Sequence, residues 1–580
     1  MRFSSRSKVS TVFSFAALSI LIGAFAFYGA FGGRQTAQAA GSATTYTSSK
    51  GSIKVAGTGD LTKTGPSATQ SQDGKVVPMR TVPKAGVSAH ASSVGRPSAK
   101  GVPFAAGRLL QNFDGVNAIQ SRSVNQFNVE PPDEALAVGN GYVMNAVNEA
   151  FIIYNTSGSI VAGPVNIANF VGEPSAFVNG TTTSDPRAYY DKATNTWFLV
   201  IWSYDNGSVS GVQSSSIHVA VNTSGNPLTK WTLYNIDTTN AGGNGVNDAN
   251  CPCFPDYTIL GIDQYNLYLS GQEFPITNAG NTNGSEIYVV SKSQLESSAT
   301  ANYVRFGSLS IAGTIAYHVQ PAVTHGNANA EYFMNSLDPN STFDNRIGVW
   351  AITNRQAVTT GVGTPNLSST VISSEAYGFP VNAQTPVGYN FRIGQATTGL
   401  LNPDFDAMQE VQYINGHLVG ALNTSITIPG DTSARDGNAW FQVSPKLSGS
   451  VISGSTKVSA QGYIASQGNF LLYPHIEQSA DGTTAMTFSV TGPNTYPSAA
   501  YAVKTAGSAN FGSVQIAGAG VTSDNGFTCT PKVQGICRWG DYSAGQLDPN
   551  SNNIWFATQY IPNNGNSTVN WGNRVFEVSA

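Results

Sequence analysis

One supersecondary unit recurs seven times after about residue 105, and this recurrence limits the possible folds more than any other feature. The copies begin at Pro131, Asp185, Pro255, His318, Asp406, Pro474 and Trp539. Each has an apolar strand, a turn containing Gly, Asn or Asp, and a second strand, which is the pattern of a tight hairpin. Fixed recurrence of one unit is the signature of a repeat architecture. The sequence therefore predicts an all-β fold, a seven-bladed β-propeller.

A third strand follows every hairpin, and a fourth can be assigned after most of them. The seventh unit has no fourth strand because the chain ends at Ala580. The segment RLLQNFDGV at Arg108 precedes the first hairpin and has no hairpin of its own. We expect it to supply the missing outer strand of the last blade and so to close the ring of residues 106–580, since closure removes open sheet edges.

The units are unevenly spaced, and the surplus residues lie before three of the hairpins. They occur in FVGEPSAFVNGTTTS before the second unit, NIDTTNAGGNGVNDANCPC before the third, and residues 366–403 before the fifth. Loops that precede innermost strands gather on one face of a propeller, around the mouth of its channel. Such loop-rich faces usually carry binding sites.

The first 40 residues have the pattern of a secretory signal. Arg2, Arg6 and Lys8 precede an uncharged apolar stretch from Val12 to Phe31, and AQAA at 37–40 offers a cleavage site after Ala39 or Ala40. The alternative is an uncleaved membrane anchor, since the apolar stretch is almost long enough to span a bilayer. Both interpretations place the propeller outside the cytoplasm, secreted or on the cell surface.

Residues 41–105 are rich in Ser, Thr, Gly and Lys, with few large apolar side chains. Such a segment cannot bury enough apolar surface to offset its ordering entropy, so we expect a disordered linker. It is basic, whereas the remaining chain is acidic. The linker could rest on an anionic surface polymer or act as a plain spacer. Nucleic acid is excluded as a partner of the propeller, because phosphate binding needs clustered Lys and Arg.

The chain has four cysteines, which in an exported protein are expected to form disulfides. Cys529 and Cys537 enclose a short loop, and we favour pairing them. Cys251 and Cys253 have only Pro252 between them. They either bond to each other or form cross-links to Cys529 and Cys537. A metal site of four thiols is disfavoured, because exported cysteines are normally oxidised.

Polar side chains mark the start of every innermost strand, and three interpretations of them compete. In the first, these groups accept hydrogen bonds from backbone N–H groups of the next blade and hold the ring together. In the second, they bind a ligand at the channel mouth, an extracellular glycan or cell-surface polymer. The residues proposed for binding are Asp185, Arg187, Tyr257, His318, Gln320, His475, Arg538, Trp539 and Tyr542. Tyr257 and Trp539 would stack on sugar faces.

The third interpretation is a glycoside hydrolase or lyase of sialidase-like architecture, which would need paired carboxylates. The candidates are Asp133, Asp256, Glu477 and Asp541. No nucleophile elbow, zinc-protease pair or phosphate-binding loop is present in the sequence. A calcium ion among Asp133, Asp185, Asp256 and Asp541 is a weaker prediction, because the chain has no contiguous calcium loop. A structural or adhesive surface protein is the remaining alternative.

Three motifs resemble those of a group of secreted bacterial seven-bladed β-propeller proteins without an assigned activity. They are PPDEALAVGNGYVMNAVN from Pro131, CPCFPDYTILGIDQYNLYLSGQEF from Cys251, and CRWGDYSAGQLDPNSNNIWFATQY from Cys537. The first departs from the group at Glu134 and Ala135. The resemblance implies export and a propeller, and it brings no catalytic residue to carry over.

Overall fold

The computed structural model describes residues 44–62, 72–76, 94–173, 181–208, 210–277, 282–337, 343–390, 395–530, 535–562 and 569–579. Residues 1–40 lie outside these ranges, so the signal peptide and the anchor remain predictions. Across the described ranges, no helix has the length and apolar character needed to cross a membrane.

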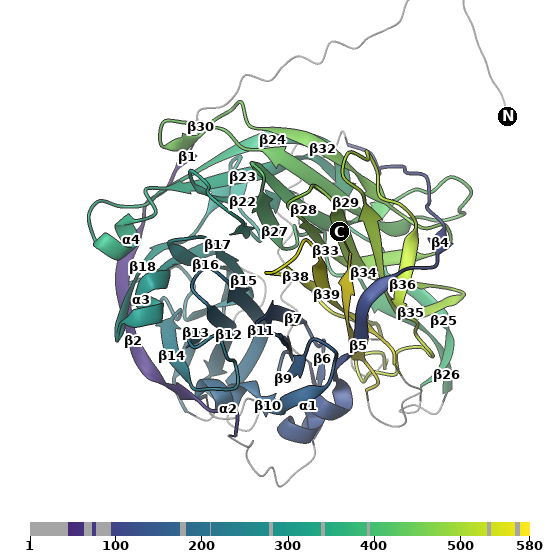
Figure 1. The fold of residues 1–580 in the computed structure, drawn as a ribbon, viewed down its shortest axis with the longest axis horizontal. Helices are drawn as coiled ribbons and strands as arrows, with labels where there is room; N and C mark the ends of the chain where they lie inside the picture. The colour runs from purple at the N-terminus through teal and green to yellow at the C-terminus, as the bar shows by residue number, and fades with distance from the viewer. Residues whose placement is uncertain are drawn as a thin grey trace, which may run out of the picture. The chain divides into compact units, whose positions relative to one another are not determined.

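The chain is dominated by antiparallel runs of four strands, in which each strand pairs with the next (Figure 1). The first runs along the chain are β7 (Ala135–Gly139), β8 (Tyr142–Val147), β9 (Ala150–Asn155) and β10 (Ile160–Asn166); β11 (Thr181–Asp191), β12 (Thr196–Asn206), β13 (Gln213–Asn222) and β14 (Trp231–Asp237); and β15 (Cys253–Ile262), β16 (Asn266–Pro275), β17 (Gly284–Ser291) and β18 (Thr300–Phe306). The next are β21 (Gln320–Thr324), β22 (Glu331–Ser336), β23 (Phe343–Thr353) and β24 (Asn366–Gly378); and β27 (Val411–Ile414), β28 (His417–Ile426), β29 (Arg435–Ser444) and β32 (Lys457–Ile464). The last are β33 (Phe470–Gln478), β34 (Thr484–Gly492), β35 (Thr495–Lys504) and β36 (Val514–Gly518); and β38 (Ala544–Leu547), β39 (Ile554–Tyr560), β40 (Gly572–Val578) and β5 (Leu109–Asn117). None of the sheets in the described residues closes on itself.

The predicted hairpins form at the turns that the sequence indicates. Asn140 and Gly141 between β7 and β8 have φ of 48° and 84°, and Asn415 and Gly416 between β27 and β28 have 52° and 82°. Two consecutive positive φ angles are the geometry that favours Asn-Gly in hairpins. The expected partner of the last hairpin is also confirmed, because β5 pairs with β40 from Asn117 to Leu109.

The hydrophobic core lies between the faces of consecutive runs. Trp202 of β12 packs with Phe254 of β15, and Phe333 of β22 packs with Tyr268 of β16. The last run also packs on the first, since Trp555 of β39 shares a cluster with Val138 of β7. The apolar contacts therefore follow the order of the runs and return to the first.

Short elements connect these runs. The helices are α1 (Ala118–Asn125), α2 (Ile167–Val171), α3 (Lys292–Ser297) and α4 (Ala357–Thr360). The short strands are β3 (Gln72–Val76) with β6 (Phe127–Glu130), β19 (Ser310–Ile311) with β20 (Thr314–Ile315), and β30 (Leu447–Ser448) with β31 (Val451–Ile452). A further sheet joins β25 (Ala383–Asn390), β26 (Gln395–Asn402) and β37 (Cys537–Arg538). Residues 366–403, expected to be loop, therefore contain β24 and the β25–β26 hairpin.

The segment expected to be a disordered linker contains ordered strands in its described parts. In β2 (Ser49–Gly59), residues 49–54 pair with β18 and residues 55–59 pair with β14. β1 (Thr44–Thr45) pairs with β24, and β4 (Phe104–Ala105) pairs with β36. These pairings use backbone groups, so the segment needs little apolar surface of its own. It covers edges that would otherwise be open.

Candidate functional site

The first strands of the runs share a backbone feature that the sequence did not reveal. In or just before five of them one residue has a left-handed conformation, with φ of 49° at Asp133, 55° at Asp185, 58° at Tyr257, 44° at His318 and 55° at Tyr473. Asp133 and His318 precede their strands, whereas the other three lie at register shifts inside β11, β15 and β33. Such angles are uncommon for residues other than glycine and persist only where the surroundings hold them. The same local geometry therefore recurs in or just before these first strands.

Side chains of the preceding run accept the backbone N–H of these left-handed residues. Asn148 Oδ1 accepts from Asp185 N at 2.9 Å, Gln272 Oε1 from His318 N at 3.2 Å, and Asn423 Oδ1 from Tyr473 N at 2.8 Å. Asp185 Oδ2 does the same for Tyr257 N at 2.8 Å. Hydrogen bonds thus join neighbouring runs, but amides in or just after second strands accept three of these four, and Asp185 is the one predicted residue among the four acceptors. Gln320, proposed for binding, is fully buried, and neither its Oε1 nor its Nε2 has a hydrogen-bond partner among the described residues.

Three of the predicted acidic residues meet at the starts of neighbouring runs. Asp133, Asp185 and Asp541 each offer a carboxylate oxygen, and these oxygens all lie within 4.8 Å of one another. Asp256, the fourth residue predicted for calcium, is not part of this group. Arg538 Nη2 lies 3.0 Å from both oxygens of Asp541. We call Asp133, Asp185 and Asp541 the aspartate triad.

Burial dominates the electrostatics around the triad. Asp133 has no exposed surface, and burial, followed by the charges of Asp541 and Asp185, raises the pKa of its carboxyl well above the usual range. The pKa of Asp404 is also raised, first by burial and then by Asp541. Asn148 Nδ2 donates to Asp133 Oδ2 at 2.7 Å, whereas Asp133 Oδ1 has no hydrogen-bond partner among the described residues.

A chain of charged groups connects three further predicted residues. Arg187 Nε lies 3.3 Å from Glu410 Oε1, and Glu410 Oε2 lies 3.4 Å from His475 Nδ1. His475 Nε2 lies 3.1 Å from Glu477 Oε1. Burial alone would lower the pKa of His475, but the hydrogen bond to Glu477 and the charge of Glu410 raise it. The Arg187 guanidinium also lies 3.2 Å from the centroid of the Tyr542 ring.

The aromatic residues predicted to stack on sugars are interior side chains. Trp539 is 0% exposed and belongs to an apolar cluster, and Tyr257 is 5% exposed. Tyr257 packs edge-on against His318 and Tyr542, and its hydroxyl donates to Gln409. Burial lowers the pKa of His318 to about 3, so this imidazole is neutral. In this conformation other side chains cover these rings, so they offer no face to a sugar.

A cavity of 640 Å³ lies at the C-terminal ends of the first strands of five runs. It is lined by the hairpin turns after β11, β15, β21, β33 and β38, and not by the loop-rich face that we expected. The half-buried Tyr189 lines it together with Asp191, Lys292, His325 and Asp548. Lys292 Nζ lies 2.6 Å from Asp191 Oδ2. The cavity therefore combines an aromatic ring with charged and polar groups from several sheets.

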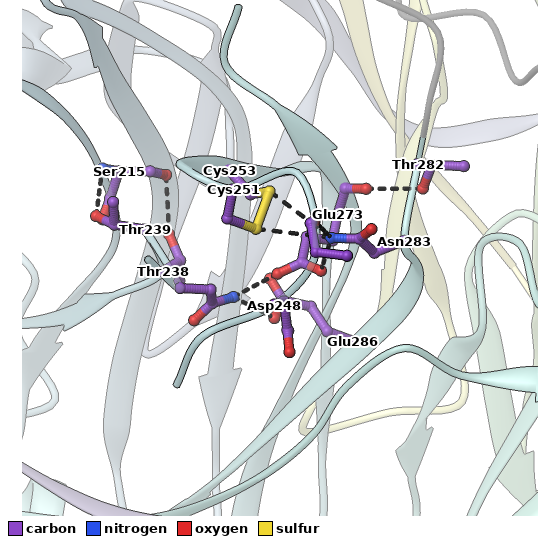
Figure 2. The surroundings of a disulfide bond; sticks show 12 residues. Ser215, Thr238, Thr239, Asp248, Cys251, Cys253, Glu273, Thr282, Asn283 and Glu286 are labelled. Atoms are coloured by element: carbon purple, nitrogen blue, oxygen red, sulfur yellow. Dashed lines mark hydrogen bonds between the residues drawn. A yellow bond between two sulfur atoms is a disulfide. The ribbon is translucent and has the colours of Figure 1, made fainter. Parts of the chain in front are cut away.

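The favoured pairing Cys529–Cys537 is confirmed, and Cys251 and Cys253, whose pairing the sequence left open, also form a disulfide with each other. Asn283 lies beside the first, with Nδ2 at 3.6 Å and 3.8 Å from the two sulfurs (Figure 2). Glu273, Glu286 and Asp248 gather next to it in the same view. The neighbouring Arg305 binds all three carboxylates. This disulfide is part of a buried charged cluster that fixes the loop before β15.

The fold is thus an all-β assembly of four-stranded runs, with the aspartate triad near the beginning of the first strands of three runs and an open cavity after the first strands of five. No protein-family model matches the chain, and no curated protein matches it. It is similar in structure to a thermostable family-43 glycoside hydrolase, at 11% identity over 77% of this chain and 88% of that chain, with a TM-score of 0.24.

Two other solved structures resemble the chain at a comparable level. One is an ulvan lyase of polysaccharide lyase family PL25, at 10% identity over 84% of this chain and 96% of that one, with a TM-score of 0.30. The other is the Trypanosoma rangeli sialidase in complex with 2,3-difluorosialic acid, at 8% identity over 73% and 56%, with a TM-score of 0.30. Likeness at this level assigns no activity to this chain.

Proposed function

We propose that residues 106–580 form a seven-bladed β-propeller in which each four-stranded run is one blade. The order of the apolar contacts supports this arrangement, because they pass from each run to the next and return from the last to the first. The innermost strands would then surround a channel, with the aspartate triad at one end and the 640 Å³ cavity at the other.

We propose that this propeller is exported and binds an extracellular glycan or cell-surface polymer in the cavity. The observation that carries the proposal is the half-buried ring of Tyr189 among Asp191, Lys292, His325 and Asp548. A sugar presents an apolar face and a rim of hydroxyls, and an aromatic ring beside carboxylates and an ammonium group complements both. Concave sites with a few convergent polar groups are the usual form of small-molecule sites.

A glycan array followed by calorimetry tests the binding. We expect a set of oligosaccharides to bind the purified chain, and Tyr189→Ala to weaken that binding at least tenfold. The matched control is Tyr496→Ala, which removes a half-buried tyrosine that does not line the cavity. Equal losses in both variants, or unchanged binding in Tyr189→Ala, would place the glycan elsewhere.

The enzymatic alternative makes a separate prediction. The triad oxygens of Asp133 and Asp541 lie within 4.8 Å, which is closer than the spacing of about 5 to 9 Å that glycosidases use, and Asp133 is fully buried. Release of reducing or unsaturated sugars from a bound glycan would nevertheless identify a hydrolase or lyase. A protein that binds no glycan at millimolar concentration would be the structural or adhesive surface protein.

We propose that residues 1–40 direct export. The two disulfides support an oxidising compartment. N-terminal sequencing of the mature protein tests the route. A start at Ala40 or Gly41 is the expected result for a cleaved signal, whereas an intact N-terminus in the membrane fraction would identify the anchor.

A further inference from the structure

We propose that the aspartate triad binds a calcium ion that joins the last four-stranded run to the first two. Asp541 precedes β38 of the last run, Asp133 precedes β7 of the first, and Asp185 lies in β11 of the second. Their carboxylate oxygens lie within 4.8 Å of one another. An ion in contact with all three would connect segments more than 350 residues apart in the sequence at the point where the two ends of the fold meet.

The second observation is an unsatisfied oxygen on one of the triad carboxyl groups. Asp133 is 0% exposed, and its Oδ1 has no hydrogen-bond partner among the described residues, although its Oδ2 accepts from Asn148. Buried oxygens of this kind are rare and need an explanation, an unobserved ion among them. A cation between the three carboxylates would satisfy this atom directly.

The surrounding charges do not neutralise the triad. Arg538 is engaged by both oxygens of Asp541, and Arg187 is paired with Glu410 and packed on the Tyr542 ring. Burial and then the charge of Asp541 raise the pKa of Asp404, and burial raises the pKa of Glu134 to about 8, so neither side chain is a counter-charge to the triad. The three carboxyl groups of the triad outnumber the two arginines, which favours a divalent cation.

The ligand set indicates which ion. It consists of carboxylate oxygens, with no imidazole or thiolate in the group, and hard oxygen ligands suit calcium or magnesium and not zinc or copper. Calcium accepts irregular arrangements of protein oxygens, whereas magnesium requires a near-ideal octahedron and retains several waters. Three carboxylates from separate segments, two of them buried, fit calcium better.

Terbium luminescence tests the site, because terbium replaces calcium and is sensitised by nearby aromatic rings. Trp202 Nε1 donates to Asp185 Oδ2 at 2.6 Å, so an ion on Asp185 lies beside an indole ring. After treatment of the purified full chain with EDTA, we expect saturable terbium emission at one ion per chain, displaced by calcium and not by equimolar magnesium. Asp133→Asn should weaken binding at least tenfold.

Asp256→Asn is the matched control, since Asp256 lies in the first strand of a run, β15, but outside the triad. It should bind terbium like the wild type. Calcium should also raise the melting temperature of the wild type and of Asp256→Asn, but not of Asp133→Asn, which reports binding independently of luminescence. Absence of saturable emission from the wild type, wild-type affinity in Asp133→Asn, or a tenfold loss in Asp256→Asn overturns the proposal.

Discussion

Replacing Arg305 with methionine should destabilise the protein more than the loss of any single surface ion pair. Arg305 binds Asp248, Glu273 and Glu286. These three acidic residues lie beside the Cys251–Cys253 disulfide (Figure 2). Its Nε lies 2.7 Å from Glu286 Oε2 and its Nη2 lies 3.1 Å from Glu273 Oε1. Both glutamates are 0% exposed. Methionine keeps most of the side-chain volume but leaves two buried carboxylates without their counter-charge.

The expected loss follows from the cost of an uncompensated buried charge. Breaking a buried ion pair by removing one partner costs about 3 to 5 kcal/mol. Burial and the charge of Glu286 raise the pKa of Glu273 to about 8 even with Arg305 in place. Without Arg305 this pKa rises further, so the folded state holds a proton that the unfolded state releases. Stability of the variant should therefore continue to fall as the pH rises above about 8, where the contribution of Glu273 in the wild type is already lost.

Urea unfolding followed by tryptophan fluorescence measures the effect. Arg574→Met is the matched control, because its partner Asp114 has 61% of its side chain exposed, and exposed pairs contribute about 0 to 1 kcal/mol. The triple variant Arg305→Met, Glu273→Gln, Glu286→Gln should recover part of the loss. If Arg305→Met is as stable as Arg574→Met at pH 8, the cluster does not hold the loop as argued.

Three further predictions concern other parts of the fold. Asn148→Ala should cost about 1 to 3 kcal/mol in urea unfolding, because it leaves the buried N–H of Asp185 without an acceptor, and a loss below that of an exposed Asn→Ala would contradict the stapling role. Burial, followed by the charge of Asp524, raises the pKa of Glu130 to about 8. The stability contributed by protonated Glu130 should be fully present below about pH 4.5 and decline as the pH rises to 8. Glu130→Gln should flatten that part of the stability–pH profile. Deleting residues 41–62 should open the edges of β14 and β18 and cause concentration-dependent self-association in light scattering, whereas a chain that stays monomeric would show that β2 is not needed to cover them.

The sequence predicted the repeated hairpins because their turn chemistry is local. Asn415 and Gly416 have the positive φ angles that such a turn needs. The pairing of β5 with β40 was predictable for a different reason, since the seventh hairpin lacked an outer strand and only one spare segment was available. The first inference depends on local turn chemistry and the second on counting strands in each unit. Neither requires knowledge of tertiary contacts.

The strand β2 was missed because its order comes from its partners. Its residues are mostly exposed, and only Ile53 and Gly59 are buried along its length. A segment of this composition gives no apolar periodicity to detect. Its order comes from backbone hydrogen bonds to the outer strands β14 and β18. Those partners lie far along the chain, so the sequence of the segment alone gives no sign of them.

The amides that join neighbouring runs left a signal that could have been found. Asn148, Gln272 and Asn423 each stand at or near the end of a second strand, at corresponding places in the repeated unit. The sequence prediction relied on the recurring acidic residues instead, and the recurring amides were not used. Reading the last residue of each copy, in addition to the first, would have predicted these contacts.

This division of roles changes the interpretation of the acidic residues. Amides accept most of the backbone N–H groups of the left-handed residues, so joining the runs does not require an acid there. Among the described residues, Asp133 accepts from the side chain of Asn148 alone. An amide at position 133 would satisfy the same neighbour without the cost of burying a charge. A carboxylate at a fully buried position next to Asp185 and Asp541 therefore needs a reason beyond architecture, and a bound cation supplies one.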